Sequence, residues 1–154
     1  ISNITVEYSI EKYIILSPFA VSHLTSKRLP YYNVLIILIE DKYKREYKII
    51  VAPGPDEIKD SKKINALCIL DNGRALDISQ LSALIRSSSF VVANDTGPAH
   101  MSAHLNVKGL TLFGSHKSAF LQSIERDNFK AIQVSDLNKL SAEKVFENLL
   151  KSLN

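Results

Sequence analysis

The residues best suited to chemistry lie where an apolar stretch gives way to a helical one. The run Asn94–Pro98 (NDTGP) directly follows the apolar stretch Phe90–Ala93. Asp95 or Thr96 can cap the helix that follows, and Gly97 lets a ligand approach the backbone closely. Unpaired N–H groups at a helix start, together with the positive end of the helix dipole, attract anions. The run therefore predicts an anion-binding site.

A histidine extends this predicted site. His100 follows Thr96 by four residues, about one helical turn, so its imidazole leans over the same place. The alternative is a well-capped helix that carries a solvated histidine. His100 and His104 also have the spacing of a zinc pair, but the glutamate of H-E-x-x-H is missing between them and no third ligand is evident. We therefore expect no metal site.

Two further polar segments follow apolar runs. Within Ser17–Pro30, Ser22 and His23 supply hydrogen-bond donors and Lys27 supplies a positive charge. Charge-assisted bonds from such groups to phosphate oxygens are worth about 1.5–3 kcal/mol each. The segment therefore suits a phosphate-binding loop; the alternative is a solvated basic loop, which is the more frequent case for any one segment of this kind.

The other segment, Pro53–Glu57, carries an acidic pair. One of its carboxylates can accept hydrogen bonds from a ribose diol, as acidic residues do in nucleotide-binding α/β folds. The alternative is that Asp56 and Glu57 only favour the first turn of a helix through its dipole.

Six short apolar runs predict the strands that position these polar segments. Their lengths and β-branched content predict strands buried on both faces, the pattern of a parallel sheet. The runs are Tyr13–Leu16, Lys48–Val51, Ala66–Leu70, Phe90–Ala93, Leu110–Phe113 and Ala131–Val134.

Helical patterns lie between and after these runs. Apolar residues form a stripe over Ile78–Ile85 and another over Ser141–Leu153, and we expect a helix that starts near Pro30 and runs to Asp41. The alternation predicts an α/β fold with a Rossmann-like, doubly wound parallel sheet. Such sheets bind ligands at the carboxyl ends of their strands, which is where the three polar segments fall.

Composition narrows the class of protein. The chain has 154 residues, 45% of them hydrophobic and 23% charged, which is typical of one globular domain with a core and not of a disordered chain. Its longest apolar run, Val34–Ile39, is far shorter than the ~20 residues of a membrane span. A net charge of +3 is too small to indicate a nucleic-acid groove. The single cysteine, Cys68, excludes an internal disulfide and predicts a buried thiol in a reducing compartment.

Several motifs of known enzymes are missing. The sequence has no G-x-G-x-x-G after the first apolar run, no G-x-x-x-x-G-K-[ST] and no G-x-S-x-G. A dehydrogenase, a P-loop enzyme and an α/β-hydrolase are therefore disfavoured.

The run NDTGPAHMSAHLNVKGLTLFG, residues 94–114, resembles the signature of the glycosyltransferase family 9 heptosyltransferases. Enzymes of that family build the inner core of bacterial lipopolysaccharide from ADP-heptose. Other segments resemble the family in the same order, so the resemblance extends from Tyr13 to Leu153. These segments are Ser17–Ala20, Lys27–Pro30, Pro53–Glu57, Leu76–Ser79 and Ser141–Leu153.

The resemblance implies a two-domain GT-B transferase, of which this chain is the C-terminal, donor-binding half. It implies sugar transfer with inversion and without a metal or cofactor. For the diphosphate, the resemblance implies contacts from Ser22, His23 and Lys27 on one side and from Thr96, Gly97 and His100 on the other. For the nucleoside, it implies that Glu57 takes the ribose hydroxyls and that the backbone near Ile78 binds adenine. For the sugar, it implies that Asp95 holds the hydroxyls.

The family's catalytic base is an aspartate of the N-terminal domain, so we expect no catalytic residue in this chain and no transfer by it alone. The polar segment Ile1–Lys12 and the start at Ile1 predict a linker tail, followed by a nucleotide-sugar-binding domain over residues 13–154 and preceded by an acceptor domain upstream. A lipopolysaccharide core acceptor would bind through that upstream domain. The implied location is the cytoplasm, at the inner face of the inner membrane, with at most peripheral membrane contact.

Three positions depart from the family pattern. Leu29 stands where a tryptophan is usual, which is a change in packing, and Ser22-His23 replaces a hydroxyl pair in the segment assigned to the diphosphate. Gly114-Ser115-His116 stands where Gly-Pro-Thr is usual, which leaves the donor sugar open. A GT-B transferase for another nucleotide sugar and a stand-alone nucleotide-binding module therefore remain alternatives.

Overall fold

A computed structural model of the chain describes residues 11–18, 22–44, 46–94, 97–113, 129–133 and 141–153, without the side chains of residues 22–31, 97–100, 113 and 133. The strands are β1 (Tyr13–Ser17), β2 (Lys48–Val51), β3 (Leu67–Cys68), β4 (Phe90–Asn94), β5 (Gly109–Phe113) and β6 (Phe129–Gln133). The helices are α2 (Ser22–Tyr43), α3 (Ile58–Ser61), α4 (Ile78–Arg86), α5 (Gly97–His104) and α7 (Ala142–Leu153).

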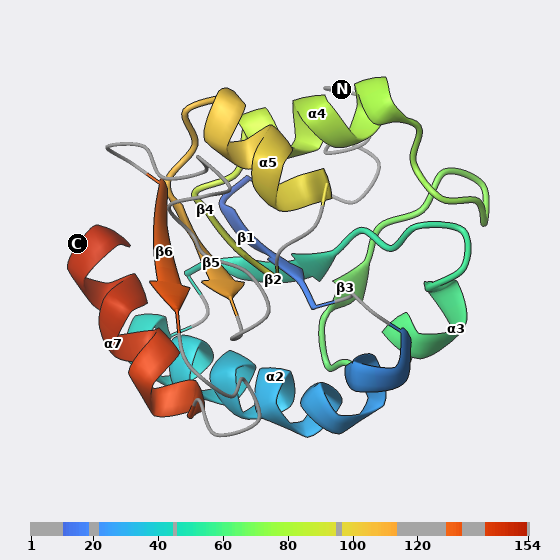
Figure 1. Cartoon of the computed structure of the whole chain (residues 1–154). Coiled ribbons are helices and arrows are strands. Elements are labelled where there is room, and N and C mark those ends of the chain that lie inside the picture. Colours follow the sequence, from blue (N-terminus) through green and yellow to red (C-terminus); the bar gives the residue numbers. More distant parts are fainter. Residues whose placement is uncertain are drawn as a thin grey trace.

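The six strands form one parallel sheet in the order β3-β2-β1-β4-β5-β6 (Figure 1). This is the strand order of the Rossmann fold, in which the chain winds outward from the centre in both directions. The doubly wound parallel sheet expected from the six apolar runs is confirmed. The runs also locate the strands well, although β3 is shorter than the run Ala66–Leu70.

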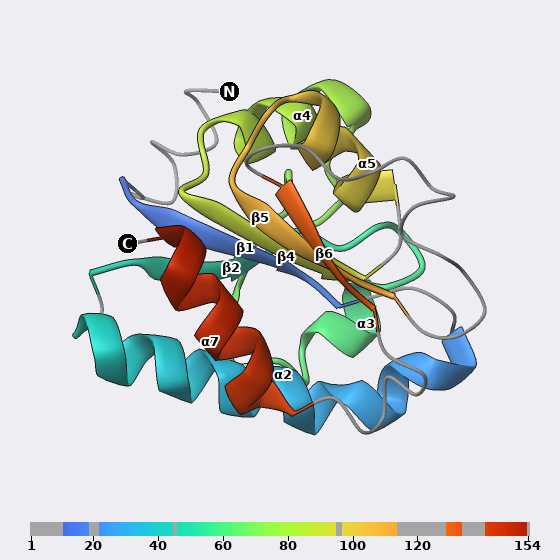
Figure 2. The ribbon, with the colours of Figure 1, turned by 60° about the vertical axis from the view of Figure 1, so that its left-hand side comes forward.

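Helices cover both faces of the sheet. In Figure 2, α2 and α7 lie side by side under one face, and α4 and α5 lie on the other. Each layer has its own apolar core, because neighbouring residues of a strand point to opposite faces. Ile14 and Leu16 of β1 pack with α2 and α7, whereas Tyr13 and Ile15 pack with α4 and α5.

The start of helix α2 differs from the sequence expectation. The helix begins at Ser22, so Pro30 lies in its interior and the expected loop Ser17–Pro30 is much shorter. Proline favours a first helical turn only where its missing N–H costs nothing. Inside α2 it removes one hydrogen bond, which the remaining bonds of a 22-residue helix and its packed face outweigh.

One smaller expectation also needs correction. Cys68 is half-buried rather than buried, and its Sγ lies 3.4 Å from Oγ of Ser61. None of the helices in the described ranges is both long and apolar enough to span a membrane.

A buried tyrosine anchors the amino end of β1. The hydroxyl of Tyr13 donates a 2.5 Å hydrogen bond to the carbonyl of Leu84 in α4, and the side chain is only 1% exposed. Burial raises the pKa of Tyr13 from 10.0 to about 12, against a smaller opposing effect of a hydrogen bond from Ser87. The folded state therefore binds this proton more tightly than the unfolded chain does.

We predict that this tyrosine makes stability fall at alkaline pH. Its contribution is complete below pH 10, the ordinary pKa of tyrosine, and is lost as the pH rises through about 12, the pKa in the folded state. Urea unfolding from pH 8 to 12 should show the difference between wild type and Tyr13→Phe shrinking above pH 10. A difference that is independent of pH would contradict the assignment.

Candidate functional site

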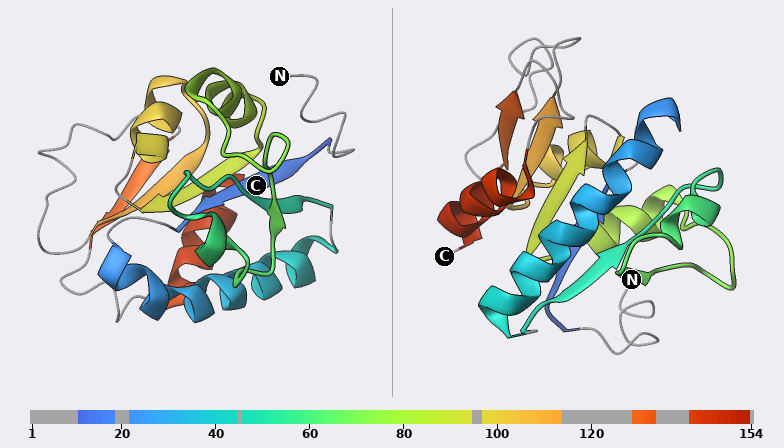
Figure 3. Two further views of the ribbon diagram at one scale, coloured as in Figure 1. Left: turned by 90° about the vertical axis from the view of Figure 1, so that its right-hand side faces the viewer. Right: turned by 90° about the horizontal axis from the view of Figure 1, so that it is seen from below.

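The sheet order creates a natural binding place between β1 and β4. These two strands are neighbours, yet the chain leaves β1 towards β2 and β3 and leaves β4 towards β5 and β6. The connections therefore diverge at the carboxyl ends of the strands, and in open α/β sheets ligands bind at this switch point. Helices α2, α3, α4 and α5 all begin on the right-hand side of Figure 1, which faces the viewer in the left panel of Figure 3.

Both predicted phosphate-binding segments border this switch point. Helix α2, which follows β1, begins at Ser22 and includes His23 and Lys27, so these three residues lie in the first two turns of a helix rather than in a long loop. Helix α5, which follows β4, begins at Gly97 and includes His100. The side chains of Ser22, His23, Lys27 and His100 lie outside the description, as do Asp95, Thr96 and the segment Gly114-Ser115-His116. Their roles as ligands stay predictions.

Three residues to which the sequence analysis assigned no role connect the two strand ends. Asn94, the last residue of β4, donates from Nδ2 to the carbonyl of Pro18 at 2.6 Å. Its Oδ1 accepts from the hydroxyl of Tyr32 in α2 at 2.8 Å. We call Pro18, Tyr32 and Asn94 the strand-end clamp. An amide at the end of a fully apolar strand was the available signal, because a buried amide needs partners.

Glu57 lies in a tight turn after β2, at the start of α3. Its Oε1 accepts a 2.8 Å hydrogen bond from the N–H of Gly54, and its own N–H donates to the carbonyl of Gly54 at 3.0 Å. Within the described residues, Oε2 makes no hydrogen bond. The half-buried carboxylate therefore holds the turn with one oxygen, and the other has no hydrogen-bond partner among the described residues.

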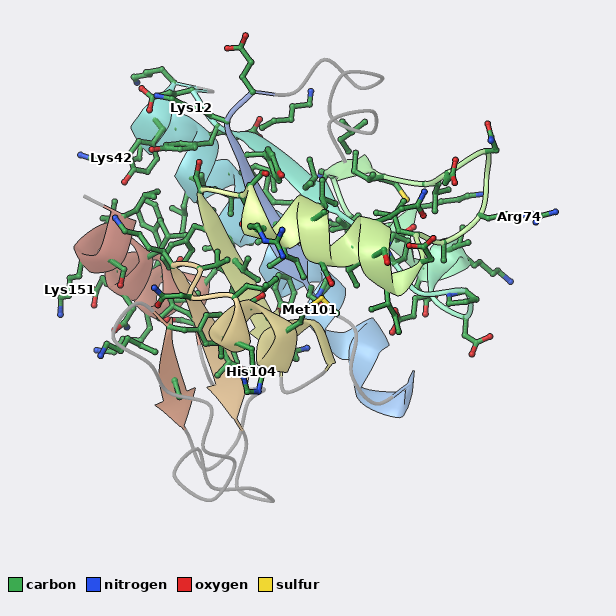
Figure 4. All side chains as sticks on the ribbon, turned by 90° about the horizontal axis from the view of Figure 1, so that it is seen from above. Lys12, Lys42, Arg74, Met101, His104 and Lys151 are labelled. Atoms are coloured by element: carbon green, nitrogen blue, oxygen red, sulfur yellow. The ribbon has the colours of Figure 1, made fainter. Side chains whose placement is uncertain are left out.

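Ile78 is the first residue of α4 and is 76% exposed. The preceding residue, Asp77, forms a capping box with Gln80, whose side-chain amide also donates to the carboxylate of Asp71 at 2.9 Å. These bonds tie the helix start to the turn Asp71–Arg74, from which Arg74 points away from the protein (Figure 4). The backbone near Ile78 is thus rigidly supported and open to solvent.

Small side chains line the sheet beneath α5. Ser17, Ala93, Thr111 and Ala131 are in register on four adjacent strands. Thr111 is fully buried, and its Oγ1 has no hydrogen-bond partner in the part of the chain that the structure describes. A buried hydroxyl without a partner costs about 1–3 kcal/mol.

We predict that Thr111→Val raises the free energy of unfolding by about 1 kcal/mol, because valine keeps the shape and removes the unsatisfied hydroxyl. Chemical denaturation measures this change. Thr111→Ala serves as the control and should destabilise the protein, since it leaves a cavity. A destabilised Thr111→Val variant would show that the hydroxyl has a partner.

Comparison with known proteins identifies the family. The sequence model described as glycosyltransferase family 9 (heptosyltransferase) matches residues 5–150. The chain belongs to glycosyltransferase family 9. The resemblance found in NDTGPAHMSAHLNVKGLTLFG is therefore confirmed at the level of the family. None of the curated proteins compared with this chain matches it.

Solved structures of heptosyltransferases share the fold of this family 9 chain. The E. coli heptosyltransferase WaaC with ADP-2-deoxy-2-fluoro heptose has a TM-score of 0.75 at 18% identity, covering 93% of this chain and 44% of that one. The E. coli ADP-heptose lps heptosyltransferase II has a TM-score of 0.74 at 20% identity, covering 99% and 50%.

An enzyme with another nucleotide sugar has a similar structure. The Methanocaldococcus jannaschii UDP-GlcNAc 2-epimerase, in complex with UDP-GlcNAc and UDP, has a TM-score of 0.67 at 16% identity and covers 100% of this chain and 42% of that one. The chain thus spans no more than half of the length of either heptosyltransferase. At these identities the likeness establishes the fold and leaves the ligand to be argued from the site.

Proposed function

We propose that this chain is the donor-binding half of an inverting heptosyltransferase of lipopolysaccharide core biosynthesis, with an ADP-heptose-like nucleotide sugar as its donor. One observation carries the proposal: in a family 9 chain, two helices that bear the predicted phosphate ligands begin at the β1–β4 switch point. Structures of a relative with ADP and with an ADP-heptose analogue support the choice of nucleotide.

In the proposed reaction, an acceptor hydroxyl attacks the anomeric carbon of the donor sugar. The new carbon–oxygen bond forms on one face while the bond to the diphosphate breaks on the other, so the configuration inverts. The hydroxyl proton passes to a general base, which we place in the acceptor-binding half of the enzyme, so this chain alone transfers no sugar. The lipopolysaccharide core acceptor would bind there, at the cytoplasmic face of the inner membrane.

The chain's own residues stabilise the leaving group in this proposal. Negative charge grows on the diphosphate as the bond breaks. Lys27, the N–H groups at the start of α5 and His100 are the donors that meet this charge, with Thr96 beside them, while Asp95 holds hydroxyls of the sugar. Donors fixed before the reaction stabilise such charge without the cost of reorganisation.

The nucleoside would lie at the other half of the sheet. Glu57 offers Oε2 to the ribose hydroxyls, and the open backbone near Ile78 accepts the adenine. The fold shared with a UDP-GlcNAc 2-epimerase favours one second candidate, a transferase that uses a uridine nucleotide. A nucleotide-binding module without transfer activity is the remaining alternative.

Calorimetry of this chain against ADP, UDP, GDP and NAD tests the nucleotide class. We expect ADP to bind at least about tenfold more tightly than the others, a difference of about 1.4 kcal/mol. Binding should be unchanged in EDTA, because the predicted phosphate ligands are hydrogen-bond donors and cations. A preference for UDP would favour the second candidate, and a requirement for Mg²⁺ would contradict the proposed site.

A substitution at Glu57 tests the ribose contact. Glu57→Gln keeps an oxygen for the N–H of Gly54 and loses the charge offered to the diol, so we expect about tenfold weaker ADP binding with an unchanged melting temperature. The loss should vanish with 2′,3′-dideoxy-ADP. The neighbouring exposed carboxylate provides a matched control, because Asp56→Asn should bind ADP as the wild type does. Equal losses for both variants would indicate a general charge effect instead.

A further inference from the structure

The strand-end clamp lies at the base of both proposed phosphate-binding segments. Pro18 follows β1 and precedes the segment that leads to α2, whereas Asn94 ends β4 and precedes the segment that leads to α5. Tyr32 reaches the clamp from α2 itself. The ends of β1 and β4 and helix α2 therefore meet at one side-chain amide.

The clamp extends the contact between β1 and β4 beyond the ladder. The register between the two strands ends at Ser17 and Ala93. One residue further along, the side chain of Asn94 supplies the next cross-strand hydrogen bond, to the carbonyl of Pro18. Proline has no N–H, so this carbonyl is the only backbone hydrogen-bonding group that Pro18 can offer.

The hydrogen bonds of the clamp restrict the positions of its three residues. Asn94 is 2% exposed and Tyr32 is fully buried, so the groups of this cluster depend on protein partners for their hydrogen bonds. Asn94 uses its oxygen and its nitrogen in opposite directions, a pairing that an aspartate could not make. A shift of either strand end would break a buried hydrogen bond, which is costly.

We infer that the strand-end clamp sets the distance between the two phosphate-binding segments, so that Tyr32 and Asn94 are positioning residues for the donor diphosphate. The inference rests on the proposed function. A diphosphate that bridges both segments needs donors on each side at about 2.7–2.9 Å, the length of charge-assisted bonds. A nucleoside without phosphates does not bridge them and does not depend on the clamp.

Tyr32→Phe removes one hydroxyl from the clamp, and Tyr13→Phe is its matched control. Both tyrosines are buried and donate from their hydroxyls to an oxygen of another element, but Tyr13 lies at the amino end of β1, away from the switch point. The binding of adenosine, AMP and ADP to the wild type and both variants is measured by calorimetry, well below the lowest melting temperature. This comparison separates an effect on the position of the ligands from an effect on the stability of the protein.

We expect Tyr32→Phe to weaken ADP binding about fivefold to twentyfold, with a smaller loss for AMP and less than a twofold change for adenosine. Tyr13→Phe should bind all three ligands within twofold of wild type while losing similar stability. Asn94→Ala should show a larger loss for ADP than Tyr32→Phe does. The double variant should lose no more than Asn94→Ala, because Tyr32 acts through Asn94.

The outcomes distinguish this inference from the proposed function. If the wild type binds ADP and Tyr32→Phe binds the three ligands as Tyr13→Phe does, the inference about the clamp is overturned and the proposed function stands. Equal loss for adenosine and ADP, or additive losses in the double variant, also overturns it. Wild type that binds no ADP overturns both. If Tyr32→Phe does not fold, Asn94→Ala with the same ligand series decides by the same criterion.

Discussion

The pairing of β1 with β4 is the constraint on which the rest of this structure depends. The two strands run in register from Ile14 and Phe90 to Ser17 and Ala93, and both are buried almost throughout. With these two strands at the centre, β2 and β3 extend the sheet on one side and β5 and β6 on the other, and each crossover passes over one face of the sheet. Segments far apart in the sequence then emerge side by side at one edge. The strand order therefore determines where the proposed donor site lies, before any side chain is considered.

Much of this architecture can be predicted from the sequence, because apolar runs and helical stripes are local signals. The six runs predict the strands, and the apolar spacing over Ile78–Ile85 predicts α4 closely. The start of α2 is different, because Pro30 resembles a helix start locally while the stability of the helix comes from its whole length. The bond between Tyr32 and Asn94 joins residues 62 positions apart, which no local pattern reveals. At Glu57 the sequence shows a carboxylate, but not that Gly54 already occupies one of its oxygens.

The proposed site divides between two parts of the sheet. Phosphate ligands would come from the ends of β1 and β4, whereas nucleoside contacts would come from the turns after β2 and β3. The turn Asp71–Arg74 and the start of α4 form a hydrogen-bonded unit that shares no residue with the strand-end clamp. In the proposed site, a substitution in this unit would therefore alter the nucleoside contacts without disturbing the central pair of strands.

One apolar layer joins elements from opposite ends of the chain. Tyr32, Leu35 and Ile39 of α2 share this layer with Val145 and Leu149 of α7, the 12-residue helix that is the last described element. On the ribosome, α2 emerges long before α7, so its apolar stripe stays partly uncovered until nearly all of these residues have been made. Exposed stripes of this kind bind chaperones and aggregate. The order of synthesis thus leaves this face of α2 without the cover of α7 until the end of the described chain has been made.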